Sequence, residues 1–351
     1  MTLCRHFGTC GGCAYQDMPP DAYRALKRDA VIAALERHGF ADPDVADIVC
    51  VPPRTRRRAV FKVKKNGATE IGFHAARSHA IVDMHECLVL TPRLFAAVAG
   101  LRATMHAILR ANEACELHAT ETDTGLDLAI EWRRKLLPDA AAQFAPWAER
   151  LSIARIAAGN EIVLQREVPR VRLGPADVSL PPQAFLQPTR EGESELQSQV
   201  LRILAGARRI ADLFAGCGTF TLPLARSAAV HAVDADRPML AALAAAARAT
   251  PGLKPVTTAV RDLFKRPLVP AELAPFDAVL LDPPRAGAQA QSAQIAKSKL
   301  SRIAYVSCNP QSFARDARIL ADAGFALGTV TPVDQFLWSS HIELVAGFTR
   351  P

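Results

Sequence analysis

The chain has 351 residues, half of them hydrophobic, which is enough for two domains with separate cores and excludes a disordered protein. Its 42 basic and 35 acidic residues give a net charge of +7, which favours a polyanionic partner. The polar, cysteine-rich N-terminus carries no secretory signal, and the longest apolar stretch, near residues 240–247, is too short to span a bilayer. We therefore expect a soluble, cytoplasmic protein without a membrane partner.

Three cysteines lie close together at the start of the chain. Cys4, Cys10 and Cys13 are separated by five and then two residues, among glycines that allow a tight loop. This spacing differs from the paired spacing of most zinc modules, so it favours an iron–sulfur cluster over zinc or free thiols. A fourth ligand would be Cys87, with Cys50 as the second choice.

The first half of the chain divides into three segments. Residues 1–15 would form the cysteine loop, and residues 16–47 contain apolar residues at helical spacing, which predicts a helix packed on the C-terminal domain. Residues 48–183 show short alternating runs and predict a β-rich central domain. Its densest basic stretch, residues 54–65, would be a solvated face or a contact surface for phosphates.

The segment from residue 184 to 351 alternates strands and helices. An apolar strand runs into a glycine turn at Gly216, and the next strand ends at Asp234. Two later strands end in the same way, one at Asp282 and one at Cys308. This order predicts a doubly wound, Rossmann-like α/β domain whose ligand crevice lies beyond the carboxyl ends of the strands.

The glycine turn indicates which cofactor the domain binds. A dinucleotide fingerprint would place a third glycine after Gly216 and Gly218, where this chain has Thr221. Asp234 stands at the distance expected for a residue that accepts both ribose hydroxyls, and Asp262 could meet an adenine amino group. This set favours S-adenosylmethionine over NAD, with helix capping as the alternative role for the acids.

Three side chains suggest a reaction. Asp282 precedes two prolines, which alone would also suit an amino-group methyltransferase. Cys308 changes the reaction class, because a thiolate that adds to C6 of uracil makes C5 nucleophilic enough to take a methyl group. The adduct must then lose its C5 proton, and Glu343 offers a carboxylate for that step.

Several motifs in this order resemble the RNA uracil-C5 methyltransferase family, which makes 5-methyluridine in ribosomal or transfer RNA and includes members with a [4Fe–4S] cluster. The motifs are Cys4–Cys13, the basic strand with Ile71–Phe73, Ala184–Pro188, Asp212–Gly218, Asp282–Gly287, Tyr305–Asn309, Asp334–Phe336 and His341–Glu343. They cover most of the chain, and their order is far more specific than any one of them.

The resemblance implies roles for individual residues. Cys308 would be the nucleophile, Glu343 the proton acceptor, and the four cysteines named above the cluster ligands. The donor and the uracil would be bound by Gln187, Phe214, Thr219, Asp234, Asp262 and Asp282, next to Gly216 in the glycine turn.

The resemblance also implies an architecture and a partner. We expect an α/β fold with a Rossmann-like S-adenosylmethionine methyltransferase domain (184–351), a β-rich central RNA-binding domain and an N-terminal iron–sulfur segment, in a monomer. The chain begins at the cysteine loop, without the small β-barrel with which some relatives grip RNA. Ribosomal RNA, specifically 23S rRNA, is the expected substrate, and transfer RNA is the alternative. A second hypothesis, which assigns no enzymatic activity, is a non-catalytic iron–sulfur RNA-binding protein.

Overall fold

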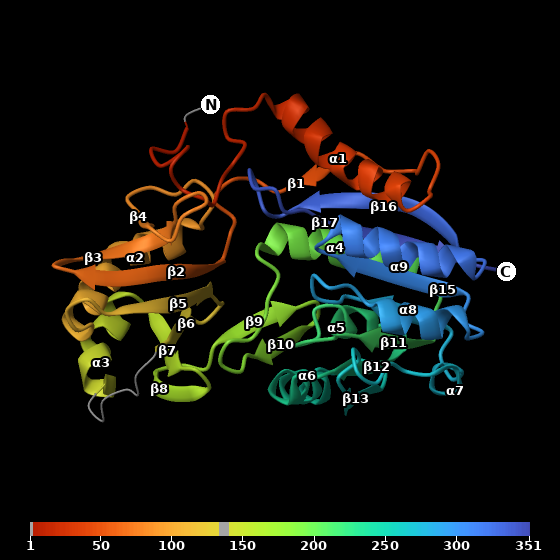
Figure 1. Cartoon of the computed structure of the whole chain (residues 1–351). Coiled ribbons are helices and arrows are strands. Elements are labelled where there is room, and N and C mark those ends of the chain that lie inside the picture. The colour runs from red at the N-terminus through yellow and green to blue at the C-terminus, as the bar shows by residue number, and fades with distance from the viewer. Residues whose placement is uncertain (1–2, 133–139) are drawn as a thin grey trace.

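The computed structural model describes residues 3–132 and 140–351 and contains two large sheets, one in each half of the molecule (Figure 1). The larger sheet has eight strands and belongs mainly to the C-terminal half. In spatial order these are β1 (Val49–Cys50), β16 (Ala326–Asp334), β17 (Glu343–Thr349), β15 (Arg302–Ser307), β14 (Ala278–Leu281), β11 (Arg209–Leu213), β12 (Ala229–Asp234) and β13 (Val256–Val260).

Most neighbouring strands of this sheet are parallel. β11 pairs with β12 and β14, β12 with β13, and β14 with β15, all in parallel, whereas β17 is antiparallel to both β15 and β16. All four residues of β14 are buried, as expected for a parallel strand covered on both faces. The carboxyl ends of the parallel strands and the start of β17 therefore meet at one edge of the sheet.

Helices cover both faces of the larger sheet. One face packs against α4 (Arg190–Ile203) and α5 (Thr221–Leu224), and the other against α1 (Pro20–Arg37), α7 (Pro270–Leu273), α8 (Gln289–Ala296) and α9 (Pro310–Asp322). Successive residues of each strand point to opposite faces of the sheet. Leu280 therefore packs in the cluster that contains α4, and Leu281 in the cluster that contains α9. None of the helices in the described ranges is long and apolar enough to cross a membrane.

Two boundaries of the expected central domain differ from the structure. β1 lies after residue 48 but pairs with β16 of the larger sheet. The hairpin of β9 (Arg170–Leu173) and β10 (Ala176–Ser179) lies before residue 183 but packs on α6 (Arg237–Ala249) in the C-terminal half. The strand pairing of β1 and the core contacts of the β9–β10 hairpin involve residues far away in the sequence, so no local sequence pattern predicts them.

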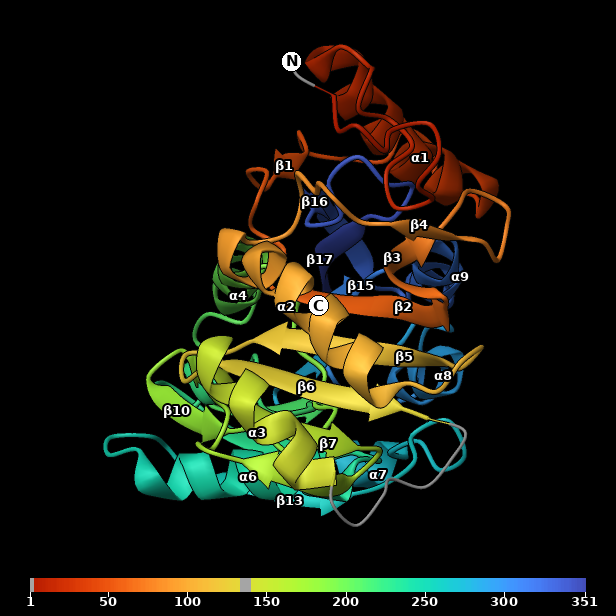
Figure 2. The same ribbon diagram turned by 90° about the vertical axis from the view of Figure 1, so that its left-hand side faces the viewer.

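The smaller sheet forms the core of the central domain. Its strands, in spatial order, are β4 (Ile81–Asp83), β3 (Ala68–His74), β2 (Arg58–Asn66), β5 (Ala114–Glu121), β6 (Leu126–Glu131), β7 (Ile153–Ala158) and β8 (Glu161–Gln165). Figure 2 shows α2 (Pro92–Ile108) and α3 (Ala140–Arg150) in front of this sheet. Phe61 and Val63 of β2 are fully buried on the helix-covered side, and the intervening residues of the strand are less buried, as the alternating pattern predicts.

Candidate functional site

A cavity of about 450 Å³ opens where the parallel strands end. Known ligand pockets have volumes of about 300–1,000 Å³. All but one of the residues that the sequence analysis assigned to the reaction and the donor pocket line this cavity: Gln187, Phe214, Gly216, Asp234, Asp262, Asp282, Cys308 and Glu343. The fold thus brings together side chains that are far apart in the sequence.

The exception is Thr219. Its side chain is buried, and its carbonyl accepts a hydrogen bond from Gln197 of α4 at 2.8 Å. It does not belong to the residues that line the cavity. The glycine turn therefore contributes Phe214 and Gly216 to the cavity, while Thr219 joins the turn to the neighbouring helix.

The glycine turn and Asp234 are connected by a hydrogen bond. Gly216 has a φ of +53°, and a Cβ at this position would meet no atom within 4 Å, so glycine supplies the left-handed conformation and leaves the space beside the turn open. Its N–H donates to Oδ2 of Asp234 at 2.9 Å. The Oδ1 atom accepts the N–H of Asp236 at 2.8 Å, so both carboxylate oxygens are held in place by the backbone.

Asp262 lines the cavity and follows β13 by two residues. Its Oδ1 accepts the N–H of Phe264 at 3.0 Å, and Phe264 packs on Phe214 with ring centroids 5.5 Å apart. Phe264 lines the cavity although half of its surface is exposed. Two phenyl rings and a carboxylate on one wall suit an adenine ring with its amino group.

Asp282, Cys308 and Glu343 form the acidic end of the cavity. Burial raises the pKa of Asp282 to about 8, and the charges of Asp212 and Asp234 add to the effect. Burial and then the Asp282 charge raise the pKa of Glu343 well above its ordinary value. Burial, followed by the charges of Glu343 and Asp282, raises the pKa of Cys308 to about 12. Such strongly shifted pKa values in one cavity are typical of catalytic sites.

Cys308 occupies the turn between β15 and α9. The strand ends at Ser307, and Asn309 caps the helix by accepting the N–H of Gln311 at 3.1 Å. The positive end of a helix favours a thiolate, and the charge of Arg285 also lowers the Cys308 pKa, against the larger effect of burial. Cys308 is partly exposed and lines the cavity, so it lies outside the hydrophobic core.

Gln335 joins Gln187 to Glu343. The Nε2 atom of Gln335 donates to Oε1 of Gln187 at 2.6 Å, and a hydrogen bond from Gln335 lowers the pKa of Glu343, against the larger effect of burial. All three side chains are at most 5 % exposed. One buried amide thus holds two residues of the cavity in fixed positions.

Sequence reasoning missed several residues at the mouth of the cavity. Phe185, Phe264 and Arg285 line it and are exposed. The guanidinium of Arg58 lies 4.6 Å from the ring centroid of Phe185, and exposed aromatic rings are surfaces on which nucleic-acid bases stack. Phe185 stands in the Ala184–Pro188 motif, which could have indicated it; Phe264 has no comparable signal.

The basic stretch of residues 54–65 is only partly exposed, and part of its charge is paired within the protein. Arg57 is 1 % exposed and pairs with Glu193 of α4 at 2.6 Å. Lys62 pairs with Glu116 on β5. Arg57 and Lys62 are thus neutralised by acidic partners, whereas Arg54 and Lys64 are exposed.

Four cysteines line a second cavity, between the N-terminal loop and the β3–β4 region. These are Cys4, Cys10, Cys13 and Cys87, the four predicted ligands, and the other walls are mainly apolar. Cys50, the second choice, lies in β1 and outside this cavity. Burial raises the pKa of Cys13 to about 11, so the unligated thiol keeps its proton at neutral pH.

The four thiols do not form a preformed tetrahedral zinc site. Within residues 3–132 and 140–351, no three cysteine Sγ atoms lie within 4.8 Å of one another. Zinc–sulfur bonds of about 2.3 Å in a tetrahedron would bring the sulfur atoms to about 3.8 Å from one another. Four cysteine thiols that line one cavity are a donor set for a thiolate-bound metal centre.

Comparison with known proteins identifies the family. A model of the tRNA (uracil-5-)-methyltransferase family matches residues 253–349. An uncharacterized RNA methyltransferase of Brucella suis is 43 % identical over 99 % of this chain and 84 % of its own length. The 23S rRNA (uracil(1939)-C(5))-methyltransferase RlmD of Halomonas elongata is 30 % identical over 99 % of this chain and 76 % of its own length. The chain belongs to the RNA uracil-C5 methyltransferase family.

A solved structure extends the likeness to the fold. The Pyrococcus abyssi tRNA (uracil-54, C5)-methyltransferase, in complex with S-adenosyl-L-homocysteine, superposes with a TM-score of 0.75 at 24 % identity, over 97 % of this chain and 85 % of that one. The α/β fold is thus confirmed, as is the family resemblance. As a member of this family, the chain is an RNA methyltransferase.

Proposed function

We propose that this methyltransferase forms 5-methyluridine in RNA by covalent catalysis from Cys308. The observation that carries the proposal is that Cys308, Asp282 and Glu343 line the same cavity as the glycine turn. The Cys308 thiol releases its proton to solvent, the resulting thiolate forms a bond to C6 of the target uracil, and the C5–C6 electron pair moves onto the C4 carbonyl as an enolate. The C5 carbon then becomes the nucleophile.

The remaining steps return the enzyme to its starting state. S-adenosylmethionine supplies an electrophilic methyl group on a sulfonium, and C5 takes this group as the sulfur–methyl bond breaks. The Glu343 carboxylate accepts the C5 proton, and the released pair restores the C5–C6 double bond as the bond to Cys308 breaks. A carboxylate whose pKa is raised by burial is a stronger base than an exposed one, which suits this step.

We assign the binding roles from the walls of the cavity. Gly216, Asp234 and Asp262, with the Phe214 ring, would hold the donor; Gln187 and Asp282 would bond the polar edges of the uracil. Cys308 lines the cavity together with the buried Glu343, so the target base would leave its stack to reach the thiol.

RNA that contains 5-fluorouridine tests the covalent step. Fluorine at C5 cannot leave as a proton, so the methylated adduct with Cys308 persists. We expect an RNA–protein complex that survives SDS, requires S-adenosylmethionine and is absent in Cys308→Ala. A methyltransferase that modifies an amino group next to Asp282 would form no such complex, and that result would overturn the proposed mechanism.

We further propose 23S rRNA as the substrate. The support is the 30 % identity to the Halomonas 23S rRNA enzyme over nearly the whole chain, whereas the transfer-RNA enzyme of known structure supports the fold alone. Mass mapping of 5-methyluridine in 23S rRNA and in transfer RNA, from cells with and without the gene, distinguishes the two. Loss from transfer RNA with intact 23S rRNA would assign the alternative substrate.

We also propose that Cys4, Cys10, Cys13 and Cys87 bind a [4Fe–4S] cluster that anchors the N-terminal loop to the central domain. The support is a cavity lined by all four thiols, together with a sequence spacing that differs from that of most zinc modules. Protein purified without oxygen should contain about four iron and four sulfide per chain. One zinc and no sulfide per chain would contradict the proposal.

A further inference from the structure

The central domain holds the segment that carries Gln187 through three consecutive carbonyl groups. The carbonyl of Leu186 accepts a hydrogen bond from Nη1 of Arg58 at 2.9 Å. That of Gln187 accepts Nε of Arg57 at 3.1 Å, and that of Pro188 accepts the backbone N–H of Arg57 at 2.9 Å. Two arginines that precede or begin β2 therefore determine where this part of the cavity wall lies.

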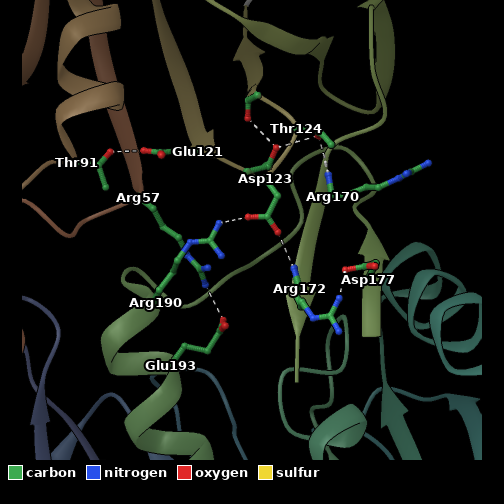
Figure 3. Close-up of polar contacts among 12 residues, drawn as sticks. Arg57, Thr91, Glu121, Asp123, Thr124, Arg170, Arg172, Asp177, Arg190 and Glu193 are labelled. Carbon is green, nitrogen blue, oxygen red and sulfur yellow. Dashed lines mark hydrogen bonds and ion pairs between the residues drawn. The ribbon is translucent and has the colours of Figure 1, made fainter. Parts of the chain in front are cut away.

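The Arg57 side chain is fixed on its other side as well. Its Nη2 atom donates to Glu193 in the first turn of α4 at 2.6 Å, and both side chains are buried. Figure 3 shows Arg57 reaching across the domain junction to Glu193, close to the ion pair between Asp123 and Arg190. A buried guanidinium between two fixed acceptors has little freedom, so it can define the position of the Gln187 backbone.

Gln187 is consequently held from both ends. Arg57 binds its carbonyl, and Gln335 binds its side-chain Oε1 at 2.6 Å. Gln187 lines the cavity, and its Nε2 atom is not left buried without a hydrogen-bond partner. An amide that is fixed in this way presents its donor to the cavity in one orientation.

We propose that Arg57 is a positioning residue for uracil: from the central domain, it sets the position of Gln187 in the catalytic cavity. This inference rests on the proposed function, in which Gln187 bonds the uracil ring. It assigns the central domain a part in the reaction that goes beyond RNA binding. A displacement of a recognition group by about 1 Å can reduce a rate by about a hundredfold, so loss of the Arg57 contact should affect kcat.

The competing role for Arg57 is that of an ion pair that only joins two domains. Two substitutions separate the roles. Arg57→Lys keeps a positive charge opposite Glu193 but removes the Nε donor to the Gln187 carbonyl. Glu193→Gln removes the charge pair but leaves the Nε donor in place. Arg54→Lys is the matched control, because Arg54 belongs to the same basic stretch and is exposed.

The experiment measures kcat and KM for RNA, the Kd of S-adenosylmethionine, the melting temperature, and hydrogen–deuterium exchange in residues 184–192. We expect Arg57→Lys to lower kcat by at least about tenfold, with an unchanged Kd of S-adenosylmethionine and faster exchange in this segment. Glu193→Gln should lower the melting temperature more than kcat, and Arg54→Lys should resemble the wild type.

Two results would overturn the inference. One is wild-type kcat and wild-type exchange in Arg57→Lys. The other is that Glu193→Gln and Arg57→Lys lower kcat equally and also lower the melting temperature equally. That result would show that Arg57 only joins the two domains. Failure of the proposed function would be recognised separately, because the wild type would then make no 5-methyluridine. The hydrogen–deuterium exchange measurement does not depend on activity and still reports on the Arg57 contact.

Discussion

Gln335 and Gln187 form a buried amide–amide hydrogen bond of 2.6 Å between the end of β16 and the segment before α4. Gln335 follows the last residue of β16 and also bonds Glu343 at the start of β17. The proposed base and the proposed uracil-binding amide therefore share one partner. In the proposed mechanism, this link would couple recognition of the uracil ring to the group that removes its proton.

Gln335→Met tests this coupling, because methionine has a similar shape but no donor. The hydrogen bond from Gln335 lowers the pKa of Glu343, so its loss should raise that pKa further. A base acts only above its pKa, so the rise of kcat with pH should move to higher pH. A shift of about one pH unit would reduce kcat about tenfold on the acidic side. Gln199→Met on α4 is the control, and an unchanged pH profile in Gln335→Met would contradict the coupling.

Glu343→Gln should separate methyl transfer from proton removal. Glutamine keeps the size of the side chain but cannot accept the C5 proton, so the methylated adduct with Cys308 should accumulate on ordinary uridine RNA. We expect an SDS-resistant RNA–protein band that depends on S-adenosylmethionine, and turnover reduced by about a hundredfold or more. If Glu343→Gln turns over normally without a trapped band, another group removes the proton.

Asp212 should make stability depend on pH. This carboxyl is fully buried at the end of β11, and burial raises its pKa to about 7 from the ordinary 3.8. Between these values the folded protein retains a proton that the unfolded chain releases, so the stability that Asp212 contributes is present at low pH and is lost as the pH rises to about 7.

Asp212→Asn should remove this dependence. The melting temperature of the variant minus that of the wild type should become more positive from pH 5 to pH 8. Each kcal/mol of difference in the free energy of unfolding corresponds to about 2–4 °C. Asp322→Asn, at a partly exposed ion pair on α9, controls for general effects of charge. A difference that stays constant with pH would show that Asp212 is ionised in the folded state.

The periodic parts of the fold could be predicted from the sequence because they depend on local patterns. The parallel strands were recognisable as apolar runs that end at Asp234, Asp282 or Cys308, and a shared sheet edge then places these residues together. The two-residue strand β1 and the β9–β10 hairpin were assigned to the wrong half, because their partners lie far away in the sequence.

The role of the arginines could not be predicted from composition. A run of basic residues has the same appearance in the sequence whether it faces water or a set of buried acceptors. Arg57 is buried because Glu193 and the carbonyl of Gln187 lie opposite it, and only the folded chain brings these partners together. Gln335 was visible as part of a motif, but its contact with Gln187 depends on the same long-range packing.

The most direct test of the central claim is the product formed by purified protein. Wild type and Cys308→Ala are incubated with 23S rRNA and S-adenosylmethionine that carries a deuterated methyl group, and the nucleosides are analysed by mass spectrometry. We predict labelled 5-methyluridine from the wild type and none from Cys308→Ala, with equal RNA binding. Labelled 5-methyluridine from Cys308→Ala, or a label on any other nucleoside from the wild type, would contradict the account.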